Sequence, residues 1–421
     1  MPLLRAAALA ACLVLSACST RASRPAEPPP RTVVLVSIDA FRADYLSDNA
    51  TPNLARLARE GAHAAWMNPS YPSLTFPNHY TLATGLRPDH HGVIHNRMSD
   101  ATIGTFAVAD RNAVGDVRWW GGEPIWVTAE RQGVRSASWA WPGSSAAIGG
   151  VRPSRWMAYD EAVPPARRID DVLAWLDAPQ AQRPRLVTVY FEQLDKAGHD
   201  HGPESPQVRR TLGELDAVIG RLRDGLAARG MLETTDLIVV SDHGMATVGP
   251  RHAISVEDMI APTIATVVSE GQSIGVQPLP GREREAEARL LGTHAQYDCY
   301  RREALPARWH YGTNPRVPPI VCQMHEGWDA LYPQKLAKRP PQATRGSHGF
   351  DPALPSMRAL FVARGPSFVP GAQLPAFDNV DVYPLLARLL GIDAAPNDGD
   401  IAPLLPALRG QVPDGDASPR H

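Results

Sequence analysis

Three runs of apolar, mostly β-branched residues stand far apart in the chain. They cover residues 32–38, 186–191 and 237–240. None alternates polar and apolar positions as a half-exposed strand does, so each predicts a strand buried on both faces, as in a parallel sheet. A later apolar run at residues 359–362 predicts another strand of the same layer.

Apolar residues between these runs recur at helical spacing. One such stripe comprises Leu212, Leu215, Ile219, Leu222 and Leu226. A helix is also predicted after Thr51-Pro52, a cap signal with proline in the first turn, and another over residues 382–390. Strands that alternate with helices predict a doubly wound α/β domain over residues 32–395, with a largely parallel central sheet and helices on both faces.

The α/β pattern breaks over residues 250–345, approximately. Short strands, a charged helix at 282–291 and segments rich in proline and tryptophan occur there. Because a structureless loop of this length is rare, we expect an inserted cap subdomain. The insertion contains Cys299 and Cys322, which lie in no CxxC pattern. In an oxidising compartment these two thiols are expected to form a disulfide.

The two ends of the chain carry their own signals. Residues 1–17 have a positive start, an apolar run and small residues before Cys18, which predicts a signal peptide. The segment resembles the lipobox of bacterial lipoproteins, which implies lipidation of Cys18 and a position on the periplasmic side of the outer membrane; the alternative is a soluble periplasmic protein. Residues 18–31 read as an extended tether and residues 396–421 as a flexible tail.

The charge balance excludes one class of partner. The 421 residues include 42 basic and 44 acidic ones, a formal net charge of −2. Such a chain lacks the electrostatic footprint needed to grip long nucleic acid. Any anionic ligand must therefore be held by a local site.

Metal-type ligands follow each of the three buried runs. They are Asp39 after the first run, Asp195 and His199 after the second, and Asp242 with His243 after the third. A single aspartate after a strand is usually a turn residue, but three such strand ends in one sheet predict a shared crevice, to which His348 returns from the insertion. Aspartate and histidine sets with open positions suit zinc, and a pair of ions suits in-line phosphoryl displacement.

Thr75 is the candidate nucleophile. It stands in Thr75-Phe76-Pro77-Asn78-His79, where a loop enters a predicted helix. A hydroxyl there lies near backbone N–H groups and the positive end of the helix, which suits an incoming anion. On its own, such a hydroxyl is more often only a helix cap.

Together these motifs resemble the nucleotide pyrophosphatase/phosphodiesterase branch of the alkaline phosphatase superfamily. The matching segments are Val36-Ser37-Ile38-Asp39, the Thr75 segment, Gly85-Leu86-Arg87-Pro88 with His91-Gly92 and Asn96, Asp195-Lys196-Ala197-Gly198-His199 with Gly202, Ser241-Asp242-His243-Gly244-Met245, and Gly346-Ser347-His348-Gly349. They stand in family order and span residues 33–390, approximately. The resemblance implies an alkaline phosphatase-like fold.

The resemblance also implies site roles and two Zn²⁺ ions. One ion would be held by Asp39, Thr75, Asp242 and His243, and the other by Asp195, His199 and His348. Thr75 would be the nucleophile that forms a covalent intermediate, and Asn96 would donate to a phosphate oxygen. Phe76 and Tyr190 match an aromatic pair that sandwiches a nucleobase, for which plain packing is the alternative.

The implied reaction is hydrolysis of nucleotide phosphodiester and pyrophosphate bonds to nucleoside 5′-monophosphates. Two zinc ions balanced by three carboxylates and a threonine alkoxide leave the site near neutral, which favours a singly charged diester. A phosphomonoesterase or phosphonate hydrolase on the same scaffold is the alternative, with Arg42 or Arg97 as an added cation. A sulfatase is disfavoured because position 75 is threonine. The non-enzymatic alternative is a catalytically inactive surface protein that binds zinc only for stability.

Overall fold

The computed structural model describes residues 31–410. The predicted signal peptide, Cys18 and tether residues 18–30 lie outside this range, as do residues 411–421. Within the described residues, no helix is both long enough and apolar enough to span a membrane.

An eight-stranded sheet in the order β20-β2-β19-β9-β1-β8-β6-β7 forms the centre of the fold. Its strands are β1 (Thr32–Ile38), β2 (Ala62–Ala64), β6 (Ser136–Trp139), β7 (Arg155–Met157), β8 (Leu186–Phe191), β9 (Thr235–Val240), β19 (Phe361–Arg364) and β20 (Ala372–Leu374). β1 pairs in parallel with both β8 and β9. β19 runs antiparallel to its neighbours β9 and β2. The predicted largely parallel sheet is therefore confirmed.

The late strand begins two residues after its predicted start. Ala359 lies in isolated bridges to Arg42 and Met67, and regular pairing with β9 begins at Phe361. The apolar run at 359–362 thus marks the residues that are buried, and burial begins two residues before regular pairing with β9.

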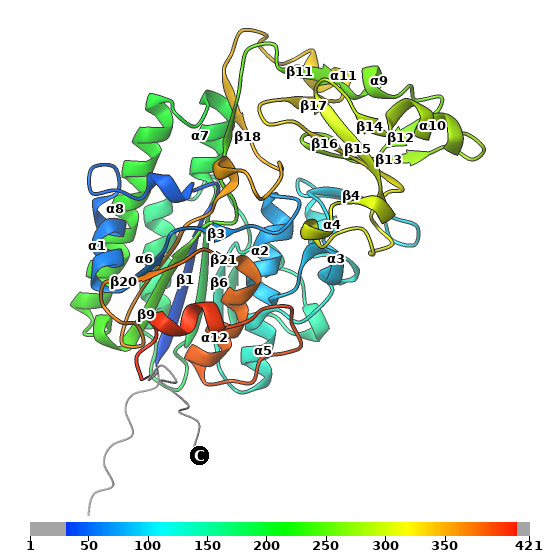
Figure 1. Ribbon diagram of the computed structural model, residues 1–421. Helices are drawn as coiled ribbons and strands as arrows, with labels where there is room; N and C mark the ends of the chain where they lie inside the picture. Colours follow the sequence, from blue (N-terminus) through cyan, green and yellow to red (C-terminus); the bar gives the residue numbers. More distant parts are fainter. Residues whose placement is uncertain (1–30, 411–421) are drawn as a thin grey trace, which may run out of the picture. The chain divides into compact units, whose positions relative to one another are not determined.

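Helices cover both faces of the sheet (Figure 1). α1 (Pro52–Glu60), α6 (Pro165–Leu176) and α8 (Pro206–Ala228) pack on one face, and α2 (Thr75–Thr84), α5 (Ile125–Arg131) and α12 (Val382–Leu390) on the other. Alternate side chains of β1 enter the two cores: Val33 and Leu35 one core, and Val34 and Val36 the other. A strand with two buried faces needs no alternation of polar and apolar positions, which explains its nearly continuous apolar run.

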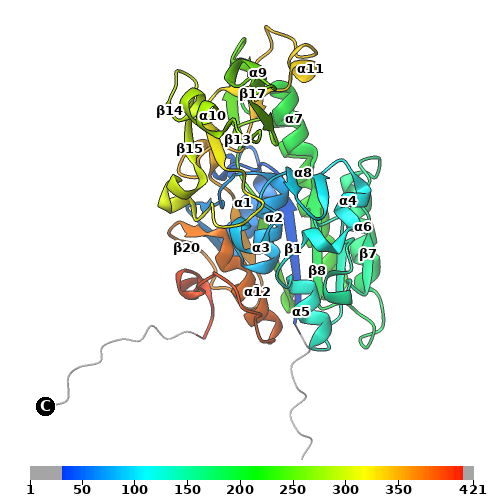
Figure 2. The same ribbon diagram turned by 90° about the vertical axis from the view of Figure 1, so that its right-hand side faces the viewer.

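The insertion builds a second sheet with its own core. Its strands, in spatial order, are β12 (Ala265–Val267), β13 (Ser273–Pro278), β16 (Ile320–Met324), β15 (Tyr297–Arg301) and β14 (Gly292–Thr293), with α10 (Glu283–Leu290) beside them. A disulfide joins Cys299 and Cys322, which are directly opposite on β15 and β16. Figures 1 and 2 show this sheet beyond the carboxyl ends of β1 and β8. Tyr71 from the main part stacks on Trp309 of the insertion, 4.0 Å between ring centroids.

The predicted flexible tail is wrong for residues 396–410. A 3₁₀ helix at Ala402–Ala407 buries Leu404, and Leu408 is buried beside it. Asp398 accepts a hydrogen bond from the Arg87 N–H (2.8 Å) and pairs with His90 (2.7 Å). Buried Leu404 and Leu408 and the contacts of the Asp398 carboxylate therefore fix this segment, although its proline, glycine and aspartate content predicted a flexible tail.

The N-terminus of α1 is capped from another helix. Thr51 occupies the cap position, but its side chain makes no cap bond; its hydroxyl instead accepts from the Ser47 N–H. The first-turn N–H groups of Asn53 and Leu54 donate to the buried Asp216 carboxylate of α8, at 3.0 and 2.9 Å. The Thr51-Pro52 signal therefore predicted the start of the helix but not its cap.

Replacing Asp216 by alanine is expected to lower the free energy of unfolding by about 1–2 kcal/mol, because two N–H groups lose their acceptor. The measurement is the urea midpoint, with Glu214→Ala as control, since Glu214 is exposed on the same helix. Equal midpoints for the two variants would contradict this role.

Candidate active site

The sheet order places the three ligand-bearing strand ends together. β9, β1 and β8 are neighbours and run parallel, so the loops that follow them lie at one edge. Asp39 follows β1, and Asp242 and His243 follow β9. α7 (Gln193–His201) follows β8 and carries Asp195 and His199 one turn apart. The predicted crevice is present.

Asp195, His199 and His348 form the first cluster. His348 follows β18 (Arg345–Ser347), on the segment that returns from the insertion. Its Nε2 lies 3.1 Å from His199 Nε2 and 3.3 Å from Asp195 Oδ1. His199 Nε2 lies 3.4 Å from the same carboxylate oxygen. Three donor atoms from two distant segments thus converge on one point.

Asp39, Asp242, His243 and Thr75 form the second cluster. His243 Nε2 lies 2.9 Å from Asp242 Oδ2, 3.6 Å from Asp39 Oδ1 and 3.4 Å from Thr75 Oγ1. The His243 ring stacks on the His348 ring, 3.8 Å between centroids. The two clusters are therefore adjacent, and the structure brings together all seven residues predicted as metal ligands.

Each of the three histidines predicted as ligands is oriented by a backbone carbonyl. Nδ1 contacts the carbonyl oxygen of Gly346 for His199, of Gly244 for His243 and of Ser73 for His348, at 2.9–3.0 Å. A ring whose Nδ1–H donates to a carbonyl keeps the Nε2 lone pair free, which is the tautomer that binds metals. Burial also lowers the pKa of His348 well below its usual value, which favours the neutral ring.

The carboxylates of these clusters fit divalent cations. Asp39 Oδ1, Asp195 Oδ1 and Asp242 Oδ2 are buried, and none has a hydrogen-bond partner among the described residues. Burial, followed by repulsion from the other two carboxylates, raises the pKa of Asp39 well above its usual value. Crowded buried oxygens beside free imidazole Nε2 atoms are a donor set of the kind that zinc takes.

Thr75 is the first residue of α2, and its hydroxyl does not act as a cap. The cap position is Leu74, with no side-chain cap bond, and the Thr75 hydroxyl faces His243 instead. Asn96 Oδ1 accepts from the Phe76 N–H at 2.9 Å, which fixes the amide group beside the threonine. Its NH₂ group is then the side available to donate to a ligand.

A cavity of about 600 Å³ opens beside Thr75. Phe76 and Tyr190 both line it, with the exposed Trp156 and Tyr159 at β7 and just beyond it. The Tyr190 hydroxyl donates to Asp39 Oδ2 at 2.6 Å. Tyr190 therefore supports a metal-type ligand in addition to lining the cavity, a role that its place in a buried strand did not suggest.

Two further groups that support the site were not predicted. His79, fully buried, contacts the Thr75 carbonyl (2.9 Å) and the Ser37 hydroxyl (2.8 Å), which uses both ring nitrogens. Its spacing of four residues from Thr75 on a helix was the available signal. Arg168 and Glu192 form a buried ion pair at 2.6 Å, and Arg168 also donates to the Tyr190 carbonyl. No local sequence pattern predicts the pairing of Arg168 with Glu192.

Known proteins are similar to this chain over the same region. A family model described as type I phosphodiesterase / nucleotide pyrophosphatase matches residues 33–351. An uncharacterised pyrophosphatase/phosphodiesterase of Schizosaccharomyces pombe is 35% identical over 396 residues, which cover 90% of this chain and 80% of that protein. Ectonucleotide pyrophosphatase/phosphodiesterase family member 1 of Rattus norvegicus is 36% identical, with 88% of this chain and 42% of that protein covered. The chain thus spans less than half of this rat relative.

Similar structures have also been solved. Murine ectonucleotide pyrophosphatase / phosphodiesterase 5, as an inactive threonine-to-alanine variant in complex with AMP, matches with a TM-score of 0.84 and 31% identity. The match covers 90% of this chain and 100% of that one. The human protein of the same name gives a TM-score of 0.85.

The raised pKa of Asp39 predicts that the stability of the metal-free protein depends on pH. The pKa of Asp39 is raised above 3.8 in the folded state, so the folded chain holds extra protons and loses stability as pH rises above that value. In chelator-treated samples, Asp39→Asn is expected to gain stability relative to the unsubstituted protein between pH 4 and pH 7, approximately. Thermal unfolding at each pH measures the difference; a constant difference would contradict the raised pKa.

Proposed function

The chain belongs to the type I phosphodiesterase / nucleotide pyrophosphatase family, and we propose that it is a two-zinc enzyme that releases nucleoside 5′-monophosphates from nucleotide phosphodiester and pyrophosphate bonds. The predicted family and α/β fold are confirmed, and the family is one of phosphoric diester hydrolases. The observation that carries the proposal is the convergence of three imidazole Nε2 atoms and three buried carboxylate oxygens at one edge of the sheet, with the Thr75 hydroxyl 3.4 Å from the Nε2 of His243.

Two zinc ions would be held by the two clusters. Asp195, His199 and His348 would hold one ion. Asp39, Thr75, Asp242 and His243, which the His243 contacts bring together, would hold the other. Bound there, the ions supply positive charge that lowers the pKa of a hydroxyl and stabilises oxygens that gain charge during displacement.

Thr75 attacks the phosphorus atom through Oγ1 in this proposal. The bond to the leaving group breaks on the opposite side, and a threonine ester of the nucleotide forms. The Asn96 amide donates to a non-bridging phosphate oxygen, in a position fixed by the Phe76 N–H. Water then cleaves the ester, which releases the monophosphate and restores the hydroxyl.

The apolar cavity supports a nucleotide as the substrate. Phe76 and Tyr190 line it, and stacking on such rings contributes about 1–3 kcal/mol per base. The murine relative was solved with AMP, which fits the same assignment.

The phosphomonoesterase alternative loses its two candidate cations. Arg42 is paired with Asp44 and Glu204, and Arg97 lies over the Tyr332 ring. Neither arginine lines the cavity that contains Thr75; the cationic side chains that line it are Arg111 and Lys196, and Lys196 pairs with Glu161. The near-neutral balance of two zinc ions against three carboxylates and an alkoxide therefore continues to favour a singly charged diester.

Export as a lipoprotein remains part of the proposal. The lipobox-like segment ending in Cys18 supports it. The names of the relatives agree with action outside the cytoplasm, since they include an ectonucleotide pyrophosphatase and venom phosphodiesterases.

Rates on two chromogenic esters test the function. We expect kcat/KM for the p-nitrophenyl ester of thymidine 5′-monophosphate to exceed that for p-nitrophenyl phosphate by about tenfold or more. Thr75→Ala should lose about a thousandfold or more of the diester activity, while Thr75→Ser, which keeps a hydroxyl, should retain part of it. Faster cleavage of the monoester would favour the phosphomonoesterase alternative. Unchanged turnover in Thr75→Ala would rule out Thr75 as the nucleophile.

Metal analysis tests the two-zinc site independently of turnover. After dialysis against zinc, the protein should retain two equivalents, and His348→Ala should retain one, because one cluster loses a ligand. The control is His252→Ala, whose ring stacks on Trp328 away from the clusters. Two equivalents in His348→Ala, or fewer than two in the unsubstituted protein, would contradict the ligand assignment.

A further inference from the structure

Six arginines gather at the amino edge of the central sheet, opposite the candidate active site. Because β1, β6 and β8 run parallel, the residues directly before them, Arg31, Arg135 and Arg185, lie at one edge. Figures 1 and 2 show this edge at the end of the described chain opposite the insertion. We call the full set the amino-edge patch; its members are Arg31, Arg135, Arg183, Arg185, Arg388 and Arg409.

Arg185 lies at the centre of the patch. Its Nε donates to the Arg31 carbonyl at 3.1 Å, and its Nη2 donates to the Leu390 carbonyl at 3.0 Å. Leu390 ends α12, and Arg388 is exposed in the last turn of the same helix. The backbone N–H of Arg185 donates to the Arg135 carbonyl at 2.9 Å. The arginines before β1 and β6 and the one at the end of α12 therefore surround a single residue.

Ser367 extends the patch to the segment near the C-terminus. Its hydroxyl accepts a hydrogen bond from Nη1 of Arg31, and its carbonyl accepts from the Arg409 N–H at 2.8 Å. Nε of Arg409 donates to the Phe368 carbonyl, also at 2.8 Å. The next residue, Val369, has an exposed side chain. The arginines are thus contiguous, with an apolar side chain beside them.

Carboxylates do not neutralise the patch. Across residues 31–410, its six members form no ion pair, whereas nearby Arg364 pairs with Glu233. Glu130 and Asp236, which also lie near this edge, accept hydrogen bonds from serines, and Asp393 is exposed. Six guanidinium charges therefore exceed the carboxylates beside them.

Three members of the patch are held in a geometry that suits phosphate groups. Arg135, Arg183 and Arg409 each use Nε to donate to a backbone carbonyl, at 2.8–3.2 Å. Their terminal nitrogens make no hydrogen bond within the part of the chain that the structure describes. A guanidinium group fixed through Nε keeps both terminal nitrogens free for the oxygens of a phosphate.

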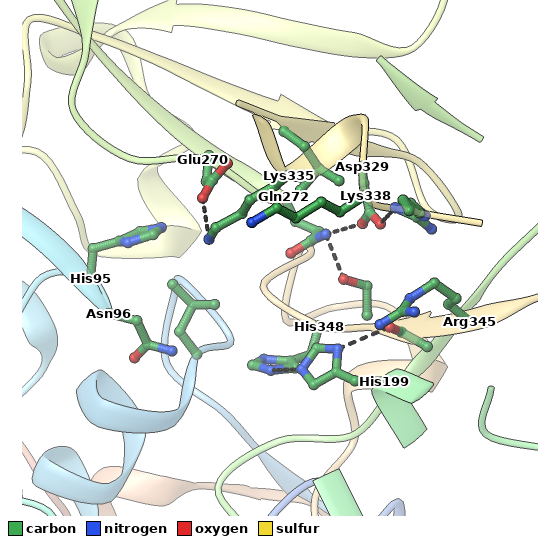
Figure 3. A pocket seen from close by; sticks show the side chains of 16 residues that line it. His95, Asn96, His199, Glu270, Gln272, Asp329, Lys335, Lys338, Arg345 and His348 are labelled. Atoms are coloured by element: carbon green, nitrogen blue, oxygen red, sulfur yellow. Dashed lines mark hydrogen bonds and ion pairs between the residues drawn. The ribbon is translucent and has the colours of Figure 1, made fainter. Parts of the chain in front are cut away.

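Cations at the opposite end of the sheet are held differently. In the cavity that His199 and His348 line, Lys335 pairs with Glu270, as Figure 3 shows. Those charges belong to the candidate active site. The amino-edge patch contributes to no cavity of that site, so its excess charge needs another explanation.

We propose that the amino-edge patch docks on a membrane surface of anionic phospholipids. Basic side chains at such a surface are attracted to the headgroup phosphates, and the attraction acts over about a Debye length, so a local patch suffices in a chain of nearly zero net charge. The apolar side chain of Val369 can enter the interface beside them.

The chain connects this patch to the predicted lipid anchor. Thirteen residues, 18–30, precede Arg31, and fully extended they reach at most about 45 Å. One acyl anchor and one polybasic patch are the two signals that hold a peripheral protein stably on a bilayer. The seven residues of β1 separate Arg31 from Asp39 by roughly 23 Å, so docking at this edge leaves the candidate active site open to solutes.

Vesicle binding without the anchor tests the proposal. The chain from Ser19 onward keeps every described residue and lacks Cys18. We expect it to partition about tenfold or more strongly onto phosphatidylcholine vesicles that contain about one third phosphatidylglycerol than onto pure phosphatidylcholine vesicles. The ratio should fall to about one in 0.5 M NaCl, approximately, and in the triple variant Arg135→Gln, Arg388→Gln, Arg409→Gln. Flotation of the vesicles measures it.

The matched control is the triple variant Arg209→Gln, Arg210→Gln, Arg284→Gln. It removes the same charge from exposed arginines of α8 and α10 that form no ion pair among residues 31–410. The control should keep the tenfold ratio, and both triple variants should keep the thermal midpoint of the unsubstituted chain. Equal ratios in the two triple variants would overturn the assignment.

Two further measurements bear on the surface and its orientation. Binding to a short DNA duplex, with no preference for the anionic vesicles, would assign the patch to nucleic acid and overturn the proposal. Turnover of the p-nitrophenyl ester of thymidine 5′-monophosphate should be the same for free and vesicle-bound protein; loss on binding would contradict docking at the amino edge. Absence of turnover in the free protein would contradict the proposed function alone, because the vesicle ratio does not depend on it.

Discussion

Three buried carboxylates held side by side are the constraint on which the site depends. Asp39, Asp195 and Asp242 stand at the ends of adjacent strands, and their repulsion, added to burial, raises the pKa of Asp39. Such a cluster is costly unless positive charge enters it. The three histidines present Nε2 toward the cluster when Nδ1–H donates to the backbone carbonyl, so neutral rings make the arrangement complementary to cations from solution.

The packing of the central strands keeps the three carboxylates side by side. β1 lies between β8 and β9 with two buried faces, so the loops after these strands cannot separate without disrupting both cores. Two candidate ligands remain: Thr75 begins α2, and His348 follows β18 on the segment that returns from the insertion. The insertion therefore completes one cluster and also forms a wall of a cavity of about 530 Å³ that His199 and His348 line. Its attachment through the Tyr71 and Trp309 rings fixes that wall relative to α2.

The sequence predicted what is local or periodic. Nearly continuous apolar runs predicted β1, β8 and β9, and the residues after them predicted the candidate ligands, because parallel strands share a carboxyl edge. It did not predict contacts whose partners are distant and individually unremarkable. Asp216 caps a helix 162 residues away, and Lys335 pairs with Glu270 across the insertion. Such pairs have no spacing rule, and burial of Leu404 depended on a surface formed elsewhere.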